Sequence, residues 1–141
     1  MQLTRLIYAS NHDGIAVEDV DRILQKSHAN NDRDGITGAL VVSDKNFMQL
    51  LEGDRTAVSQ CFMRIMQDDR HRDVQVISAG DAQDRLFVEW SMHLIRASRI
   101  KQQILSRYLI NSIFQPAGMS EAAIADLCRA LAAGDWEAMA A

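Results

Sequence analysis

Runs of apolar and alternating residues along the first 95 positions of the chain predict five strands. Apolar runs, or apolar residues at every second position, are typical of strands when polar or glycine-containing stretches bound them. Such segments cover residues 2–9, 35–43, 47–52, 74–79 and 87–95.

Two amphipathic helices are predicted between these strands, one after the first strand and one after the third. Each has apolar residues three and four positions apart, which places them on one face of a helix. We expect the first helix to begin at Val17 and to end at about Asn30, and the second to have Asp54 as its N-cap. The apolar residues of the second helix are Val58, Phe62, Ile65 and Met66.

The resulting order, β-α-β-β-α-β-β, predicts an α+β fold. Two helices packed on one face of a mainly antiparallel sheet bury the apolar surfaces economically. Right-handed crossovers then give a ferredoxin-like arrangement, in which the first and third strands lie side by side in the middle of the sheet. The fifth strand is an addition to that arrangement.

After residue 97 the apolar spacing becomes helical throughout, with a break at Pro116, the only proline. Ser120 is the predicted N-cap of a helix, and Asp135 that of a short last turn. We expect these helices to cover the sheet face that the first two leave bare, so that residues 1–97 form one domain and 98–141 a helical extension. The apolar residues of the extension are Ile100, Ile104, Leu105, Tyr108, Leu109, Ile113, Ile124, Leu127, Leu131, Trp136 and Met139.

Composition narrows the classes of protein without choosing a function. With 48% hydrophobic and 24% charged residues among 141, the chain has the balance of a soluble globular protein. No apolar run approaches the ~18 residues of a membrane span, and no export signal stands at the N-terminus. The net charge of −4 argues against nucleic-acid binding. Cys61 and Cys128 lie outside any C-x-x-C pattern and the histidines have no metal-ligand spacing, so we expect a cytoplasmic protein without a metal site.

The inward face of the first helix turns polar in its last turn. The spacing from Val20 and Leu24 reaches Ser27 and Asn31, and the spacing from Ile23 reaches Ser27 and Asn30. An unpaired buried amide costs about 1–3 kcal/mol, so these side chains need partners. Two explanations stay open: the asparagines end the helix, or they bind a ligand that has carbonyl and imide edges.

The third predicted strand places an amide among apolar residues. Alternation puts Gln49 on one face with Phe47 and Leu51, while Met48 lies on the other face. Tyr8, on the neighbouring first strand, falls within reach of Gln49. A structural hydrogen bond to nearby backbone explains Gln49 alone, and ring packing with a local hydroxyl bond explains Tyr8 alone. Binding of a flat heterocycle explains the group, with Ile23, Leu24, Ile65 and Met66 as apolar walls. Trp90 and Met92 share a face of the fifth predicted strand, which ordinary core packing would explain.

Five segments taken together resemble the BLUF domain, the family of blue-light sensors that use FAD. The resemblance covers residues 1 to about 95, and the helices that follow make the chain similar to short BLUF proteins without an attached output enzyme. The segments are Arg5-Leu6-Ile7-Tyr8-Ala9-Ser10, Asn30-Asn31 with Gly35-Ile36-Thr37-Gly38-Ala39-Leu40, Phe47-Met48-Gln49-Leu50-Leu51-Glu52-Gly53, Asp69-Arg70-His71, and Arg85-x-Phe87-x-x-Trp90-Ser91-Met92.

The resemblance implies roles for residues around the flavin ring. Tyr8 corresponds to the tyrosine that donates an electron and a proton to the excited flavin. Gln49 corresponds to the glutamine between that tyrosine and the flavin, which rotates or tautomerises on illumination. Asn31 corresponds to the asparagine that binds the polar edge of the ring, and Asn30 occupies a neighbouring position.

Further positions carry implied roles in closing the pocket and in signal output. Arg70 and His71 match a segment that closes the ring pocket, and Trp90 and Met92 match a pair linked to signal output. Met48 stands where many relatives have an aromatic residue, which we expect to alter packing rather than photochemistry.

The predicted function is therefore that of a blue-light photoreceptor and not of an enzyme. It would bind FAD, with FMN or riboflavin as alternatives, and would signal to a downstream protein. The wide apolar stripe after residue 97 favours a homo-oligomer. Two alternatives have the same fold: a colourless module that binds a small regulatory molecule, and an interaction adaptor whose inward polar residues bond only one another.

Overall fold

Five strands form one sheet in the computed structural model, which describes residues 2–68, 71–89 and 91–138. They are β1 (Leu3–Asn11), β2 (Thr37–Val42), β3 (Asn46–Asp54), β4 (Arg72–Asp81) and β5 (His93–Arg96), in the order β4-β1-β3-β2-β5. β5 pairs parallel to β2, and the other neighbours are antiparallel. The predicted ferredoxin-like α+β fold, with β1 and β3 side by side, is confirmed.

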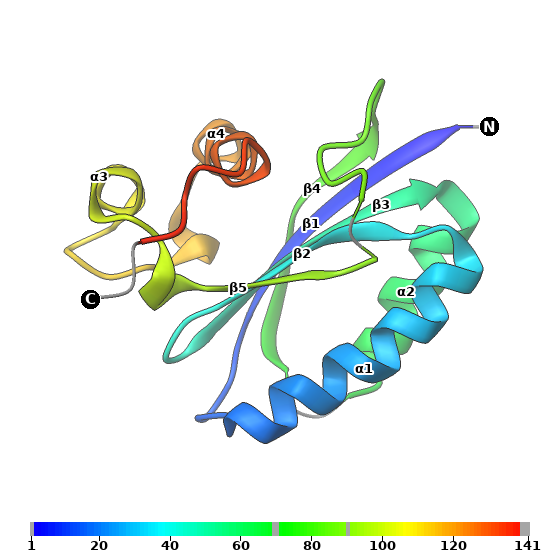
Figure 1. Cartoon of the computed structure of the whole chain (residues 1–141), viewed down its shortest axis with the longest axis horizontal. Helices are drawn as coiled ribbons and strands as arrows, with labels where there is room; N and C mark the ends of the chain where they lie inside the picture. The colour runs from blue at the N-terminus through cyan, green and yellow to red at the C-terminus, as the bar shows by residue number, and fades with distance from the viewer. Residues whose placement is uncertain (1, 69–70, 90, 139–141) are drawn as a thin grey trace.

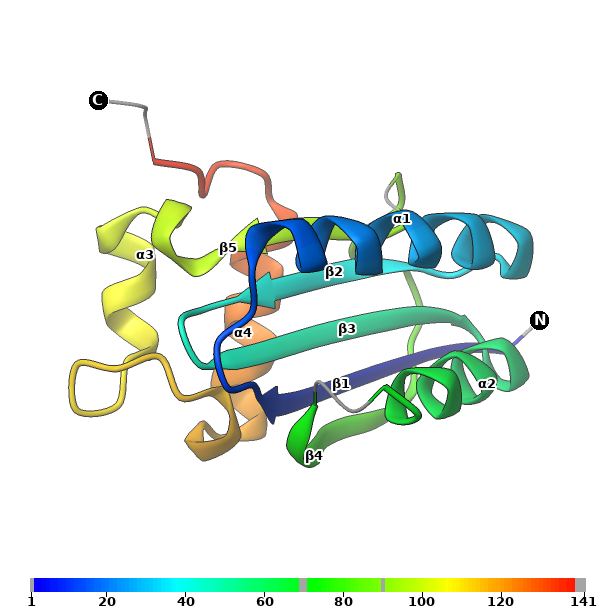
Figure 2. The same cartoon turned by 90° about the horizontal axis from the view of Figure 1, so that it is seen from below.

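Helices α1 (Val17–Asp34) and α2 (Arg55–Met66) lie on the same face of this sheet (Figures 1 and 2). Their core includes Val20, Leu51 and Val58. α1 continues beyond the predicted end at Asn30, and Gly35 stops it with a φ of 70°, in the left-handed region that favours glycine. Asn31 is therefore a helical residue, and a glycine, not an asparagine, caps the helix.

The chain after β5 covers the opposite face, as predicted. The elements there are η1 (Ala97–Arg99), α3 (Gln102–Leu105), η2 (Ser106–Tyr108), η3 (Pro116–Gly118) and α4 (Glu121–Ala132). α4 lies on the sheet face opposite to α1 and α2 (Figure 1). Its residues Ile124 and Leu127 share one apolar core with Met48 and Leu50 of β3. The Oγ of Ser120 accepts a hydrogen bond from the amide of Ala123 at 3.1 Å, which confirms the predicted N-cap.

Two details of this extension differ from the prediction. The stripe over 100–113 is not one helix, because short turns interrupt it and Ile110 pairs with Ile113 around Asn111 and Ser112, both at positive φ. The expected turn after Asp135 is instead extended backbone, since Glu137 forms an antiparallel bridge with Ile100. Met139 lies outside the described residues.

The fifth strand was predicted over 87–95 and is shorter and later. Residues 82–92 connect β4 at one edge of the sheet to β5 at the other edge. The amides of Leu86 and Phe87 in this connection donate to the side chain of Glu52 and not to a neighbouring strand. Met92 therefore precedes β5, and Trp90 lies outside the described residues.

In the described part of the chain, none of the helices has both the length and the apolar character needed to cross a membrane.

The close approach of β2 to β3 at Gly38 generates a stability prediction. A Cβ at Gly38 would lie 1.9 Å from the backbone oxygen of Leu50, whereas one at Gly80 of β4 meets nothing within 4 Å. We expect Gly38→Ala to lower the free energy of unfolding by roughly 1–3 kcal/mol or more, because the strands must separate. Urea denaturation measures the loss. Gly80→Ala is the control, and equal stability of the two variants would contradict the expected clash.

Candidate functional site

A cavity of about 460 Å³ lies between α1 and α2, above β2 and β3. This volume is within the ~300–1,000 Å³ of small-molecule sites. Polar and apolar side chains both line it, as a flat ligand with polar edges requires. The residues predicted for the site that line the cavity are Ile23, Leu24, Ser27, Asn30, Asn31, Gln49, Ile65 and His71.

Gln49 joins the cavity to the hydroxyl of Tyr8. The two residues are cross-strand partners on β3 and β1, and both are buried. The hydroxyl of Tyr8 donates to Oε1 of Gln49, and Nε2 of Gln49 donates to Sδ of Met92 at 3.3 Å. A thioether sulfur is a weak acceptor, so this amide nitrogen has no strong partner among the described residues. The structural alternative predicted a hydrogen bond from Gln49 to nearby backbone. The side chain instead bonds the side chains of Tyr8 and Met92.

The last turns of α1 are tied to the segment just before β5. Nδ2 of Asn31 donates to the backbone oxygen of Ser91 at 2.8 Å, and Oδ1 of Asn31 accepts from the thiol of Cys61 at 3.7 Å. Nδ1 of His28 lies 2.5 Å from Oγ of Ser91. The side chain of Asn30 makes no hydrogen bond with any described residue, which leaves its amide available to a ligand.

Tyr8 lies in an aromatic and apolar environment. Its ring meets that of Phe62 edge-on with centroids 5.4 Å apart, and that of His71 at 6.0 Å. Burial raises the pKa of Tyr8, and the nearby Cys61 and Asp68 raise it further. The phenol is therefore held in its protonated form. His71 is itself fixed by Oγ of Ser10, 2.8 Å from its Nδ1.

Cations gather around the cavity on both helices. Arg22 and Lys26 of α1 and Arg64 of α2 line it, together with Asp68. Nη2 of Arg64 also bonds Oδ2 of Asp34 at 3.1 Å, which joins the C-terminal end of α1 to α2. A group of positive charges of this kind suits a ligand with an anionic part.

Some predicted site residues fall elsewhere. Met66 does not line the cavity, because the inward face of α2 carries Cys61 and Ile65 one turn apart, and Met66 follows about 100° further around the helix. Arg70 and Trp90 lie outside the described residues. Met92, predicted as an output residue, is also part of the cavity wall.

Sequence reasoning missed several residues that line the cavity. Phe47 could have been included, since strand alternation places it on the face of Gln49, and Cys61 precedes Ile65 by one helical turn. The charged residues carry no such signal, because polar side chains near helix ends are usually solvated. The missed residues are Arg22, Lys26, Leu40, Phe47, Cys61, Arg64, Gln67 and Asp68.

Solved structures similar to this one cover almost the whole chain. One, described as the photo-activated state of BlsA, has a TM-score of 0.85 and 25% sequence identity, and covers 97% of this chain and 99% of its own. Another, the dark-state structure of the BLUF protein BlrB, has a TM-score of 0.78 and 29% identity, with 94% and 96% covered.

Curated relatives match a part of the chain. The blue light- and temperature-regulated antirepressor BluF of Escherichia coli (strain K12) is 31% identical over 93 residues, which are 65% of this chain and 23% of that protein. The photoactivated adenylate cyclase subunit beta of Euglena gracilis is 35% identical over 75 residues, 52% of this chain and 9% of the relative. The match thus spans less than a quarter of either relative.

The family comparison agrees with both. The family model described as "Sensors of blue-light using FAD" matches residues 3–93, which include β1, both helices that flank the cavity, and β2 to β4. The matched region is therefore the one that carries the description of a blue-light sensor, and the cyclase named above extends far beyond the segment that it shares with this chain. With the match over residues 3–93 and the shared fold, the chain belongs to the BLUF family of flavin-binding blue-light sensors.

Proposed function

We propose that this protein is a blue-light photoreceptor that holds a flavin non-covalently between α1 and α2. The observation that carries the proposal is the Gln49 amide, which accepts from Tyr8 on one side and reaches only a thioether on the other. A buried amide in this position has a donor to spare for a ligand, and an unpaired donor would cost about 1–3 kcal/mol.

The cavity fits a flavin ring in both chemistry and size. The amides of Asn30, Asn31 and Gln49 suit the carbonyl and imide edge of the ring, while Leu24 and Ile65 supply apolar walls. A flavin bound there supplies absorption of blue light and an acceptor for one electron and one proton. The chain supplies orientation, exclusion of water and the donor group.

Tyr8 is the proposed donor in the light reaction. Its buried phenol holds a proton at Oη, on a short path to Oε1 of Gln49. We propose that Tyr8 gives up one electron and this proton and then recovers both, so that no lasting oxidation remains. Gln49 is left rearranged, either rotated or tautomerised, with a donor directed at the ligand carbonyl in place of Met92. A stronger hydrogen bond there shifts the absorption to longer wavelength.

FAD is the proposed cofactor, in line with the description of the family. Arg22, Lys26 and Arg64 favour a flavin that carries phosphate, because guanidinium and ammonium groups bind phosphate oxygens well. FAD and FMN share this feature and riboflavin lacks it. Acid release of the bound pigment followed by chromatography identifies the form.

Signal output is proposed to run from Met92 to β5 and on to the extension over residues 98–141. The rings of His93 of β5 and Trp136 are in contact at an interplanar angle of 57°, with centroids 5.8 Å apart, and the amide of Lys101 donates to the backbone oxygen of Trp136 at 2.8 Å. Met92 directly precedes His93, so a shift of Met92 would be passed to Trp136 through the neighbouring residue. We propose that the protein forms a homo-oligomer and signals to a downstream protein. We also propose that it acts in the cytoplasm, where the buried thiols of Cys61 and Cys128 stay reduced.

Removal of the Gln49 amide tests the photochemistry. We expect the purified protein to be yellow and to show a reversible red shift under blue light. Gln49→Leu should keep the flavin and lose the shift, because no side-chain donor remains to reach the ligand. Absorption spectra in the dark and after illumination measure this. Gln75→Leu, on exposed β4, is the control. A colourless protein would favour a regulatory module or an adaptor, and a normal photocycle in Gln49→Leu would refute the mechanism.

The raised pKa of Tyr8 predicts how stability depends on pH. Above about pH 10 the phenol ionises in the unfolded chain and stays protonated in the folded one, so unfolding releases a proton and stability falls as pH rises. Tyr8→Phe lacks this proton, and its stability should fall less steeply, by up to about 1.4 kcal/mol per pH unit. Urea denaturation between about pH 9 and 11 measures both slopes. Stability curves that stay parallel over this range would show that Tyr8 is not held protonated.

Light should alter the backbone dynamics of the extension. If Met92 transmits the change at Gln49 through β5, amide exchange over residues 98–115 should differ between the dark and illuminated states. Hydrogen–deuterium exchange with mass spectrometry measures it, with β4, which does not line the cavity, as the internal reference. Identical exchange of this segment in both states would exclude the route.

A further inference from the structure

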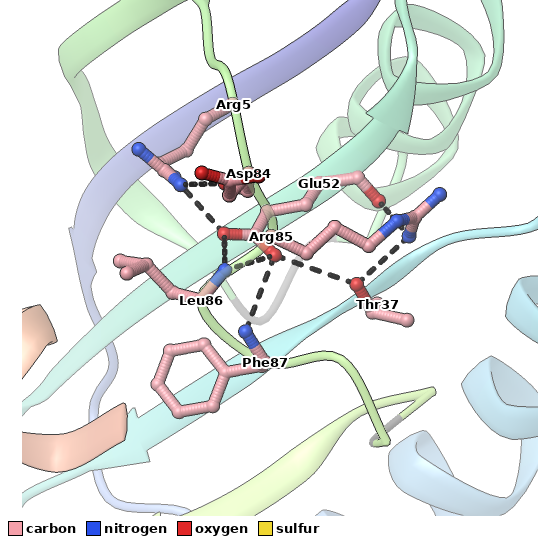
Figure 3. Close-up of polar contacts among 7 residues, drawn as sticks. All are labelled: Arg5, Thr37, Glu52, Asp84, Arg85, Leu86 and Phe87. Carbon is pink, nitrogen blue, oxygen red and sulfur yellow. Dashed lines mark hydrogen bonds and ion pairs between the residues drawn. The ribbon is translucent and has the colours of Figure 1, made fainter. Parts of the chain in front are cut away.

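Glu52 is a fully buried acidic residue on the sheet face opposite to Gln49. The two residues belong to β3 and lie three positions apart, so strand alternation directs their side chains to opposite faces. The Glu52 carboxylate accepts from Nε of Arg5 at 2.9 Å, from the amide of Leu86 at 2.8 Å, and from that of Phe87 at 3.3 Å (Figure 3). A buried carboxylate requires this degree of pairing.

The donors to Glu52 are themselves fixed by neighbours. Nη2 of Arg5 donates to the backbone oxygen of Asp84 at 2.6 Å. Nη1 of Arg85 donates to Oγ1 of Thr37 at 2.9 Å and to the backbone oxygen of Glu52 at 3.3 Å. Arg5 and Thr37 are the cross-strand partners of Glu52 on β1 and β2. Four consecutive residues, 84–87, are thus attached to a polar row that runs across the three central strands (Figure 3).

The attached segment leads directly to the cavity. Phe87 packs in the core shared with the C-terminal helices, whereas Met92 packs in the core under α1 and α2. Phe87 and Met92 are five positions apart and belong to the cores on opposite faces of the sheet. At the later end, Ser91 contacts Asn31 and Met92 contacts Gln49. Only a short stretch of chain therefore separates the residues held by Glu52 from those that contact Asn31 and Gln49.

We infer that Glu52 is a positioning residue for the light reaction, although it lies across the sheet from the cavity. Its carboxylate fixes residues 84–87 and so sets the placement of Met92 against the Gln49 amide. A purely structural role would not require a charge here, since apolar residues of similar volume often stabilise a core as well as a buried ion pair does. The inference rests on the proposed function, because the placement of Met92 has a consequence only if Gln49 rearranges.

Glu52→Gln tests the inference, with Glu89→Gln as the matched control. Both remove one negative charge, but Glu89 is an exposed residue of the same connection. In Glu52→Gln an amide nitrogen replaces one acceptor oxygen and faces the N–H donors. We expect the amides of Leu86 and Phe87 to exchange with solvent roughly ten- to a hundredfold faster, the range set by loss of hydrogen bonds to a charged group. Nuclear magnetic resonance of the dark-state protein measures these rates.

The second measurement is optical. With Met92 less firmly placed, Gln49 should return to its dark arrangement sooner, and dark recovery should accelerate about two- to thirtyfold. The dark spectrum and the flavin content should stay those of the wild type. Glu89→Gln should match the wild type in both measurements. Unchanged exchange at Leu86 and Phe87, or unchanged recovery despite faster exchange, would overturn the inference.

Arg5→Met is a second variant in case Glu52→Gln does not fold. It removes the ion pair and the bond to Asp84, and keeps the backbone donors to Glu52. We expect faster amide exchange at Leu86 and Phe87 and faster dark recovery in this variant as well, both to a smaller extent than in Glu52→Gln. If neither variant folds, Glu52 serves the stability of the whole domain and the inference is wrong. A wild-type protein without any light-induced shift refutes the proposed function instead, while the exchange measurement still reports whether Glu52 holds the connection.

Discussion

The hydrogen bond from Tyr8 to Gln49 occupies the centre of the sheet, where β1 and β3 pair and both faces are covered. A side-chain amide in such a place must be satisfied, and a glutamine has more hydrogen-bonding capacity than Tyr8 and Met92 use. The amide can also exchange its donor and acceptor by turning over. This one side chain lines the cavity, accepts a hydrogen bond from the phenol of Tyr8 and donates one to Met92.

β3 combines two requirements in a single strand. One face presents Gln49 to the cavity between the helices, and the other presents Met48 and Leu50 to the C-terminal helices, with Glu52 binding the β4–β5 connection. In the proposed light reaction, Gln49 rearranges on an element that also touches the second layer. The buried carboxylate of Glu52 binds the β4–β5 connection on that second face.

Local periodicity predicted the element order, the central pair of strands and the inward positions of Asn31 and Gln49, because burial repeats with the period of a strand or helix. It failed where nonlocal contacts decide. Leu86 and Phe87 resemble the start of a strand, yet their amides bond a side chain 34 and 35 positions away. The stripe after residue 97 has helical spacing, but turns divide it. The sequence did not predict that Arg22, Lys26 and Arg64 line the cavity, because they come from two helices that approach each other only in the folded structure.

β5 joins β2 through only four residue pairs, whereas β1 and β3 share nine. Cooperative units with few hydrogen bonds open at lower free energy than the body of a fold. The few pairs of β5 are supplemented by Ile95, which is fully buried in the core shared with the C-terminal helices. Opening of this strand would therefore expose that core and separate Trp136 from His93.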